Sequence, residues 1–160
     1  MSVDANEFKN ALKLWASGVT VVTAMSAQGP RGMTATSFSS VSVEPPQILV
    51  CLNQVTDTGA AVLEQNSFAV NILSVAQQNI SNEFAGGSSQ EQRFASVAWE
   101  SGENAAPVLT EALVSLECKV VQHVTAGTHW IVIGEVQKVQ YHTGEPLLYY
   151  HGGYRELSAI

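Results

Sequence analysis

The sequence predicts a mainly β protein in which antiparallel strands close into a barrel with a few peripheral helices. Strand signals outnumber helix signals, and the two longest predicted strands are joined by a hairpin at Ala126-Gly127. The long helices that alternate with strands in a doubly wound sheet are missing. Closure is also favoured because strands this apolar would otherwise expose their edges. A chain of 160 residues has the size of one domain, so we expect a single domain over residues 1–160.

The N-terminal part predicts a helix followed by several strands. Asp4 and Glu7 resemble a capping box, and Phe8, Leu12 and Trp15 recur at helical spacing before the helix ends at 16–18. The next segments are a strand at 19–25, a turn at 28–30, an extended segment at 32–42 ended by prolines, and a strand at 47–53. That last strand has no polar face in its middle, which predicts burial on both sides.

The remaining elements are read from caps, turns and β-branched runs. The predicted elements are a helix at 58–65, a strand at 68–73, a helix from Ser74 to Gly86, an irregular stretch at 88–107 with a helical turn near Phe94, and strands at 112–125, 128–142 and 147–151. The second of these helices opens with Ser74 and Gln77 at capping-box spacing.

Charge and composition exclude several classes of function. The chain carries 14 acidic and 7 basic residues, a formal net charge of −7, and such a surface repels nucleic acid and anionic membranes. The N-terminus lacks the basic and apolar regions of a secretory signal, and no apolar run approaches the ~20 residues of a membrane span. Cys51 and Cys118 show no metal-ligand spacing and read as buried free thiols. We therefore expect a cytoplasmic protein that binds neither nucleic acid nor membranes.

Four stretches contain residues suited to chemistry, and each also has a structural interpretation. Small hydroxyl residues occur on both faces of 33–42, which fits a flat ligand close to the backbone or a solvated edge strand. Asn53 ends an apolar strand and either contacts a ligand or caps a turn. Arg93 beside the glycine-containing stretch 85–88 either binds phosphate or is solvated. His129 and the tyrosine-rich 149–154 either hold a nicotinamide or serve packing.

Common nucleotide and hydrolase motifs are missing. The sequence has no GxGxxG after a strand, no GxxxxGK[ST], no HExxH and no GxSxG. Rossmann-type dinucleotide binding is therefore not supported, and a nicotinamide cofactor must bind in another way.

Taken together, the four stretches resemble the short-chain flavin reductase family, which includes the reductase components of two-component flavin-dependent monooxygenases. The resemblance extends from about Phe8 to Leu157. The matching segments are 16–23, 32–42 with Pro45-Pro46, 68–73, 84–86 with Arg93-Phe94, 129–136 and 149–154.

This resemblance implies a fold, an activity and partners. The fold would be a split antiparallel β-barrel of the Greek-key, FMN-binding type, in a homodimer whose flavin sites lie near the subunit interface. The activity would be hydride transfer from a reduced nicotinamide to FMN or FAD, with reduced flavin passing to a partner monooxygenase. NADH is expected over NADPH because no basic cluster for a 2′-phosphate is evident. The choice between FMN and FAD stays open.

The resemblance also implies site residues. The residues of the flavin-contacting strand would be Thr34, Ala35, Thr36, Ser37, Ser39 and Ser40. The flavin ring and ribityl region would contact Cys51, Leu52 and Asn53. The phosphate or its surroundings would contact Thr58, Phe84, Ala85 and Arg93. His129, the candidate catalytic residue, and Tyr154 would lie beside the nicotinamide. Many relatives carry Gly-Asp-His where this chain has Gly127-Thr128-His129, so the carboxylate that would orient His129 is missing.

Two other functions are compatible with the sequence. One is an enzyme similar to the split-barrel oxidases of pyridoxine phosphate, for which the chain has few basic residues. The other is a non-catalytic flavin-binding or electron-carrier protein, which would not require the His129 and Tyr154 pair.

Overall fold

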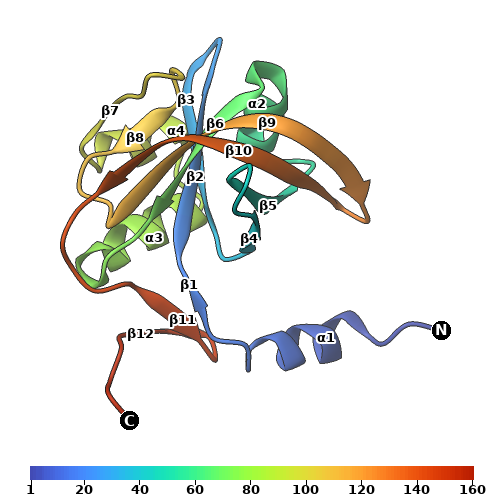
Figure 1. The fold of residues 1–160 in the computed structure, drawn as a ribbon. Helices are drawn as coiled ribbons and strands as arrows, with labels where there is room; N and C mark the ends of the chain where they lie inside the picture. Colours follow the sequence, from blue (N-terminus) through green and yellow to red (C-terminus); the bar gives the residue numbers. More distant parts are fainter.

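The protein is built around a seven-stranded antiparallel sheet, described here from a computed structural model of all residues 1–160 (Figure 1). The strand order is β3-β2-β6-β9-β10-β5-β4, and every pairing in it is antiparallel. The strands are β2 (Thr20–Ser26), β3 (Gly29–Ala35), β4 (Phe38–Ser42), β5 (Gln47–Asn53), β6 (Ser67–Ile72), β9 (Val114–Ala126) and β10 (His129–Tyr141). The predicted mainly β, antiparallel fold is confirmed.

The two edge strands of this sheet, β3 and β4, follow one another in the chain with only Thr36 and Ser37 between them. Because two residues span a few ångströms, the two edges must lie close together, and the sheet curls into a barrel. The Cys51 amide donates to the Ser37 carbonyl at 3.2 Å across this corner. The predicted single extended segment at 32–42 is therefore wrong. Ala35 pairs with β2 whereas Phe38 pairs with β5, so the chain changes partner between them.

The barrel interior is filled by alternating residues of the strands. Buried residues such as Val22, Val50, Phe68 and Val132 form this core. Along β5 the buried residues are Ile48, Val50 and Leu52, while Leu49 and Cys51 are only half-buried. The prediction of a strand buried on both sides is thus wrong, since the outer face of β5 is apolar but opens onto a cavity.

Three short helical segments pack against the barrel. They are α2 (Asp57–Gln65), α3 (Gln78–Ala85) with a preceding 3₁₀ turn (Val75–Gln77), and α4 (Gln90–Ala95). The predicted Ser74 and Gln77 capping box is confirmed, and the Ser74 amide donates to Gln77 Oε1 at 3.0 Å. A second core forms where Phe84 of α3 meets Phe94 of α4 edge to face at 5.2 Å.

The irregular stretch predicted at 88–107 contains more structure than expected. Besides α4, it contributes β7 (Trp99–Ser101) and leads into β8 (Pro107–Leu109), and these pair as a small two-stranded sheet. Their three-residue length leaves too few positions for an alternating pattern to be recognised.

The N-terminal helix and the C-terminal strands form an appendage beside the barrel (Figure 1). Helix α1 (Ala5–Leu12) begins at Asp4, whose side chain accepts from the Asn6 and Glu7 amides, and it buries none of its residues. It ends at Leu12, three residues earlier than the apolar spacing predicts. The strands β1 (Ser17–Gly18), β11 (Leu148–Tyr150) and β12 (Gly153–Arg155) form a three-stranded sheet next to it.

The β9–β10 hairpin projects from the barrel as an arm (Figure 1). Its turn is Gly127-Thr128, one residue later than predicted, and Gly127 has the positive φ of +58° that such turns require. All residues at 121–128 are exposed. No helix of the protein has both the length and the apolar character needed to cross a membrane.

Candidate functional site

Three adjoining cavities follow the chain through the corner between β3 and β4. The large cavity has a volume of about 590 Å³ and lies between α1, the corner, β5 and residues 149–151. The arginine cavity, of about 380 Å³, contains Arg93, and the tyrosine cavity, of about 300 Å³, contains Tyr154. The tyrosine cavity shares Thr34 and Ala85 with the arginine cavity, and Thr36 and Tyr149 with the large cavity. It therefore lies between the other two.

The arginine cavity brings together five residues expected at the phosphate end or on the flavin strand, namely Thr34, Thr58, Phe84, Ala85 and Arg93. The Arg93 guanidinium donates to the carbonyls of Gly32 and Gly86, both at 2.7 Å, so it ties α4 to β3 and to the end of α3. Its Nε and the Thr58 hydroxyl are buried and make no hydrogen bond. Buried polar groups normally have partners, so these two mark a polar wall that a ligand could complete.

The tyrosine cavity places Tyr154 against α3. The Tyr154 hydroxyl hydrogen-bonds to Ser81 Oγ at 2.7 Å and to Asn82 Oδ1 at 2.8 Å. The Thr34 hydroxyl donates to the Ser81 carbonyl at 2.7 Å. Both contacts use Ser81, so β12 and β3 are held on the same turn of α3.

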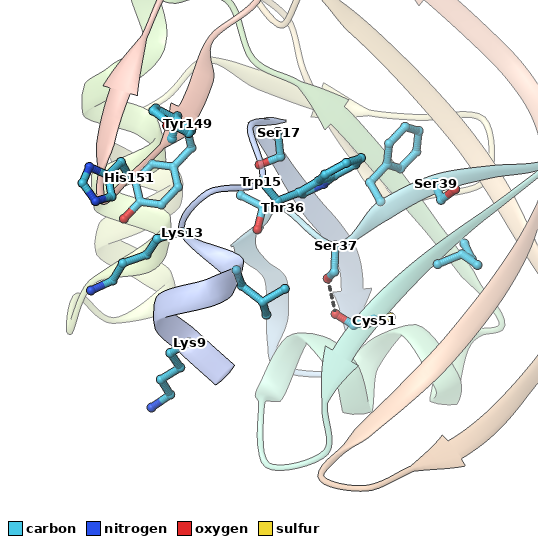
Figure 2. A pocket seen from close by; sticks show the side chains of 14 residues that line it. Lys9, Lys13, Trp15, Ser17, Thr36, Ser37, Ser39, Cys51, Tyr149 and His151 are labelled. Atoms are coloured by element: carbon cyan, nitrogen blue, oxygen red, sulfur yellow. Dashed lines mark hydrogen bonds between the residues drawn. The ribbon is translucent and has the colours of Figure 1, made fainter. Parts of the chain in front are cut away.

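The large cavity joins the corner to the outer face of β5 (Figure 2). Ser37 Oγ donates to the Cys51 carbonyl at 3.0 Å, and partial burial raises the pKa of the Cys51 thiol. Leu49 and Cys51 give the wall an apolar strip, whereas Thr36 and Ser39 add hydroxyls. The Thr36 hydroxyl makes no hydrogen bond within the chain and is free to bind a ligand.

Four predicted residues do not present side chains to these cavities. Ala35 and Leu52 are buried in the barrel core, so only their backbone is available to a ligand. Ser40 is exposed on β4. Asn53 Oδ1 accepts from the Val55 amide at 3.1 Å, which is the turn-capping arrangement considered as its alternative.

His129 also lies outside the three cavities of this chain. It pairs with Asn53 across the β5–β10 ladder, directly after the turn at the tip of the hairpin arm. Thr128 Oγ1 lies 2.8 Å from His129 Nδ1. The hydroxyl of the preceding residue therefore contacts the ring nitrogen.

Sequence reasoning missed the contribution of α1. Lys9, Lys13 and Trp15 line the large cavity together with His151, which belongs to the predicted stretch at 149–154 (Figure 2). The available signal was the spacing of Lys9 and Lys13, which places two cations on one side of a helix. It gave no indication that this helix covers a cavity.

Comparison with known proteins identifies the family. The model of the flavin reductase like domain matches residues 12–158. The chain belongs to this family. Its relatives include an FMN reductase (NADH) RutF of Pseudomonas syringae, 41% identical over 91% of this chain and 82% of that protein. Another is the reductase component of a 4-nitrophenol monooxygenase of Rhodococcus opacus, 41% identical over 94% of this chain and 80% of that protein.

Solved structures agree with this assignment and with the predicted fold. A putative flavin reductase of Haemophilus somnus superposes with a TM-score of 0.94 at 31% identity, covering 97% of this chain and all of that one. An NADH:FAD oxidoreductase of Streptomyces globisporus, solved with NAD and FAD fragments, gives 0.90 at 32% identity, covering 99% and 97%. The predicted membership of the flavin reductases and the predicted barrel fold are confirmed.

Proposed function

We propose that this protein is an NADH-dependent flavin reductase that transfers a hydride from NADH to FMN or FAD. The observation that carries this proposal is the row of three neighbouring cavities around the Thr36-Ser37 corner. Most of the residues expected at a flavin line these cavities, although they come from distant parts of the chain. The family members named above as FMN reductase (NADH) and NADH:FAD oxidoreductase support the same activity.

The residues present fit a flavin. The arginine cavity offers two donors without partners, Arg93 Nε and the Thr58 hydroxyl, and phosphate oxygens accept hydrogen bonds from such groups. The large cavity offers an apolar strip from Leu49 and Cys51 beside hydroxyls of the corner, which suits a flat ring with polar edges. We therefore assign the phosphate end to the arginine cavity and the ring end to the large cavity.

The role of the protein in this reaction is to position the flavin and nicotinamide rings, not to provide reactive groups. A bound flavin provides the acceptor for the hydride, so no nucleophile or metal centre is required of the chain. The corner residues Thr36 and Ser37 limit the depth to which a ring can enter, and Tyr154, fixed by Ser81 and Asn82, closes one side. Such positioning is effective because hydride transfer requires the two rings at roughly 3–3.5 Å.

A role for His129 at the nicotinamide stays a prediction. His129→Ala should lower NADH turnover more than flavin affinity, as measured by steady-state kinetics and fluorescence titration. Equal losses of turnover and affinity, or no loss of either, would remove His129 from the nicotinamide site.

We also propose that the protein is a homodimer. The hairpin arm exposes Val121 and Val124, and Phe8 on α1 is 55% exposed. Apolar side chains gathered on projecting elements are typical of surfaces that another protein covers. A second copy of the chain supplies a partner with the same elements, and a two-fold dimer is the commonest arrangement of soluble oligomers.

Reduced flavin is the product, and we propose that a partner monooxygenase receives it. The relative from Rhodococcus opacus, which is the reductase component of a monooxygenase, supports this role.

The activity can be tested by mixing the protein with FMN and a large excess of NADH without oxygen. Repeated addition of flavin should be followed each time by loss of its absorbance, since each enzyme turns over many flavins. Thr36→Trp, which fills the junction of the large and tyrosine cavities, should abolish flavin binding, whereas Thr143→Trp in an exposed loop should not. Bleaching of a single equivalent only would favour a flavin carrier, and normal binding by Thr36→Trp would refute the assigned site.

A further inference from the structure

Two unpaired cations lie at the end of the site opposite Arg93. Lys9 and Lys13 line the large cavity, which shares no lining residue with the arginine cavity. The only salt bridge in the structure is that of Lys138 with Glu103, so neither of these lysines is neutralised by a carboxylate. Lys13 Nζ donates only to the neutral Asn10 side chain, at 3.2 Å.

The local charge is opposite to that of the whole molecule. The chain carries a net charge of −7, but no aspartate or glutamate lines the large cavity. Two of the seven basic residues and His151 lie there instead. A cation-lined cavity in an acidic protein attracts an anionic ligand to one place while the rest of the surface repels it.

Helix α1 is held over this cavity and is not a free tail. The His151 amide donates to the Lys13 carbonyl at 2.8 Å, which ties the end of the helix to the turn between β11 and β12. Lys9 and Lys13 are four residues apart and lie on the same side of the helix (Figure 2). Trp15 follows them at the cavity and is 76% exposed, which is unusual for so large an apolar ring.

These features form a site with two adjacent cations and an exposed aromatic ring, next to the proposed ring end of the flavin. The flavin phosphate is already assigned to the arginine cavity at the other end. A diphosphate bound at the large cavity would then belong to the other substrate. Two neighbouring lysines suit a diphosphate, and Trp15 offers a surface on which an adenine can stack.

We propose that Lys9 and Lys13 bind the diphosphate of NADH, with Trp15 contacting its adenosine half, so that α1 is the dinucleotide-binding element of this reductase. The inference rests on the proposed function for the identity of the ligand. In this proposal the two lysines bind NADH but do not contact the rings between which the hydride is transferred.

The first test measures binding without turnover. ADP-ribose, which contains the diphosphate and adenosine but no nicotinamide, is titrated into the full-length protein while amide NMR signals are followed. We expect shifts in α1 and at 149–151, and an affinity about tenfold weaker in the Lys9→Gln/Lys13→Gln variant. Lys9→Arg/Lys13→Arg should retain binding, and so should Lys119→Gln, which removes an exposed lysine of β9 far from the cavity in sequence. Unchanged affinity in the double glutamine variant overturns the proposal.

The second test separates NADH from FAD as the source of the diphosphate. In the double glutamine variant, KM for NADH should rise about tenfold with kcat unchanged, while KM for reduced nicotinamide riboside, which lacks the diphosphate, should not change. Dissociation constants of FMN and FAD should both stay the same. Weaker binding of FAD with an unchanged KM for NADH would assign the diphosphate to the flavin and overturn the proposal.

Failure of the proposed function would look different. Wild-type protein that binds ADP-ribose through its lysines but reduces no flavin would refute the reductase activity and leave the lysine site in place. Wild-type protein that reduces flavin with no effect of the lysine substitutions on KM for NADH would refute only the inference.

Discussion

At the scale of single residues, the two cysteines differ in what surrounds them. Cys118 lies in the barrel core, whereas Cys51 faces the large cavity. The sequence predicted that both would be buried free thiols. Both are free, but only Cys118 is fully buried. The apolar residues around Cys51 belong partly to a binding surface, and a sequence pattern does not distinguish such a surface from a core.

This difference predicts selective labelling. The thiolate is the reactive form, so at about pH 8 an alkylating reagent should modify Cys51 slowly and Cys118 only after unfolding. FMN should protect Cys51, since the ring end of the site lies against it. Mass spectrometry after timed labelling measures both rates. Labelling of Cys51 at the same rate with saturating FMN would contradict the position assigned to the ring.

Cys118 also predicts a dependence of stability on pH. Burial, together with the neighbouring Glu117 charge, raises the pKa of the Cys118 thiol from 9.0 to about 12. Above pH 9 the unfolded chain therefore releases this proton while the folded protein keeps it, and stability present below pH 9 is lost as pH rises toward 12. The free energy of unfolding should fall by up to about 1.4 kcal/mol per pH unit from this group.

The comparison with Cys118→Ala isolates that contribution. Urea unfolding between about pH 9 and pH 11 should show a steeper fall for the wild type than for the variant, because other groups titrate equally in both. Parallel slopes would mean that the folded protein releases the Cys118 proton as readily as the unfolded chain does.

Arg93 both hydrogen-bonds to the backbone of its own chain and is predicted to bind the flavin phosphate. Its bonds to the Gly32 and Gly86 carbonyls imply that Arg93→Ala lowers the free energy of unfolding by about 2 kcal/mol, as measured with urea. The same variant should bind FMN more weakly but riboflavin almost normally. Arg31→Ala, outside the cavities, is the matched control. A parallel loss of riboflavin affinity would show that Arg93 shapes the site without binding phosphate.

At the scale of elements, a close contact inside the barrel explains a glycine in β10. A Cβ at Gly134 would lie 2.5 Å from Phe68 Cζ and 2.9 Å from Cys118 Cβ, next to a β-bulge in the β9–β10 ladder. Strand β10 can therefore pass over the Phe68 ring only without a side chain at this position.

Gly134→Ala should accordingly destabilise the fold by about 2 kcal/mol, measured by urea unfolding, because the barrel has no space for the methyl group. Gly87→Ala, with no atom within 4 Å of its Cβ, should have little effect. Phe68→Leu in the Gly134→Ala background should recover part of the loss. If the losses in free energy of unfolding of the two substitutions simply added in the double variant, the steric explanation would be contradicted.

At the scale of the whole molecule, the exposed hairpin arm bears on the oligomeric state of the protein. Val121 and Val124 are about equally exposed, at 45% and 44%, in the part of β9 that lies beyond its pairing with β6. Placing charge on the arm should therefore cost little in a monomer but disrupt a dimer in which the arm is covered.

Sedimentation velocity provides the measurement. The wild type should sediment as a dimer, and Val121→Lys/Val124→Lys should shift it to a monomer with an unchanged circular dichroism spectrum. Val43→Lys, at an exposed valine between β4 and β5, should remain dimeric. A wild-type monomer, or a dimeric arm variant, would refute the proposed interface.

The sequence alone was sufficient for the longer strands, the Ser74 cap and the family. β-branched runs, the Ser74 cap and the glycine of the β9–β10 turn are local patterns, so β2, β5, β6, β9 and β10 could be placed to within a few residues. Motifs at 32–42, 84–94 and 149–154 also identified many of the residues that line the three cavities, because each motif is short and contiguous.

Tertiary structure alone decided how those residues meet. The corner at Thr36-Ser37 contains no glycine or proline, so only the pairing of Ala35 with β2 and of Phe38 with β5 reveals it. Three other features likewise depend on residues far apart in the chain. They are the hydrogen bonds from Arg93 to two backbone carbonyls, the open outer face of β5 and the position of α1 over the large cavity. Periodicity in a sequence shows which side chains avoid water. Packing between distant segments determines whether a neighbour in the chain or a ligand covers them.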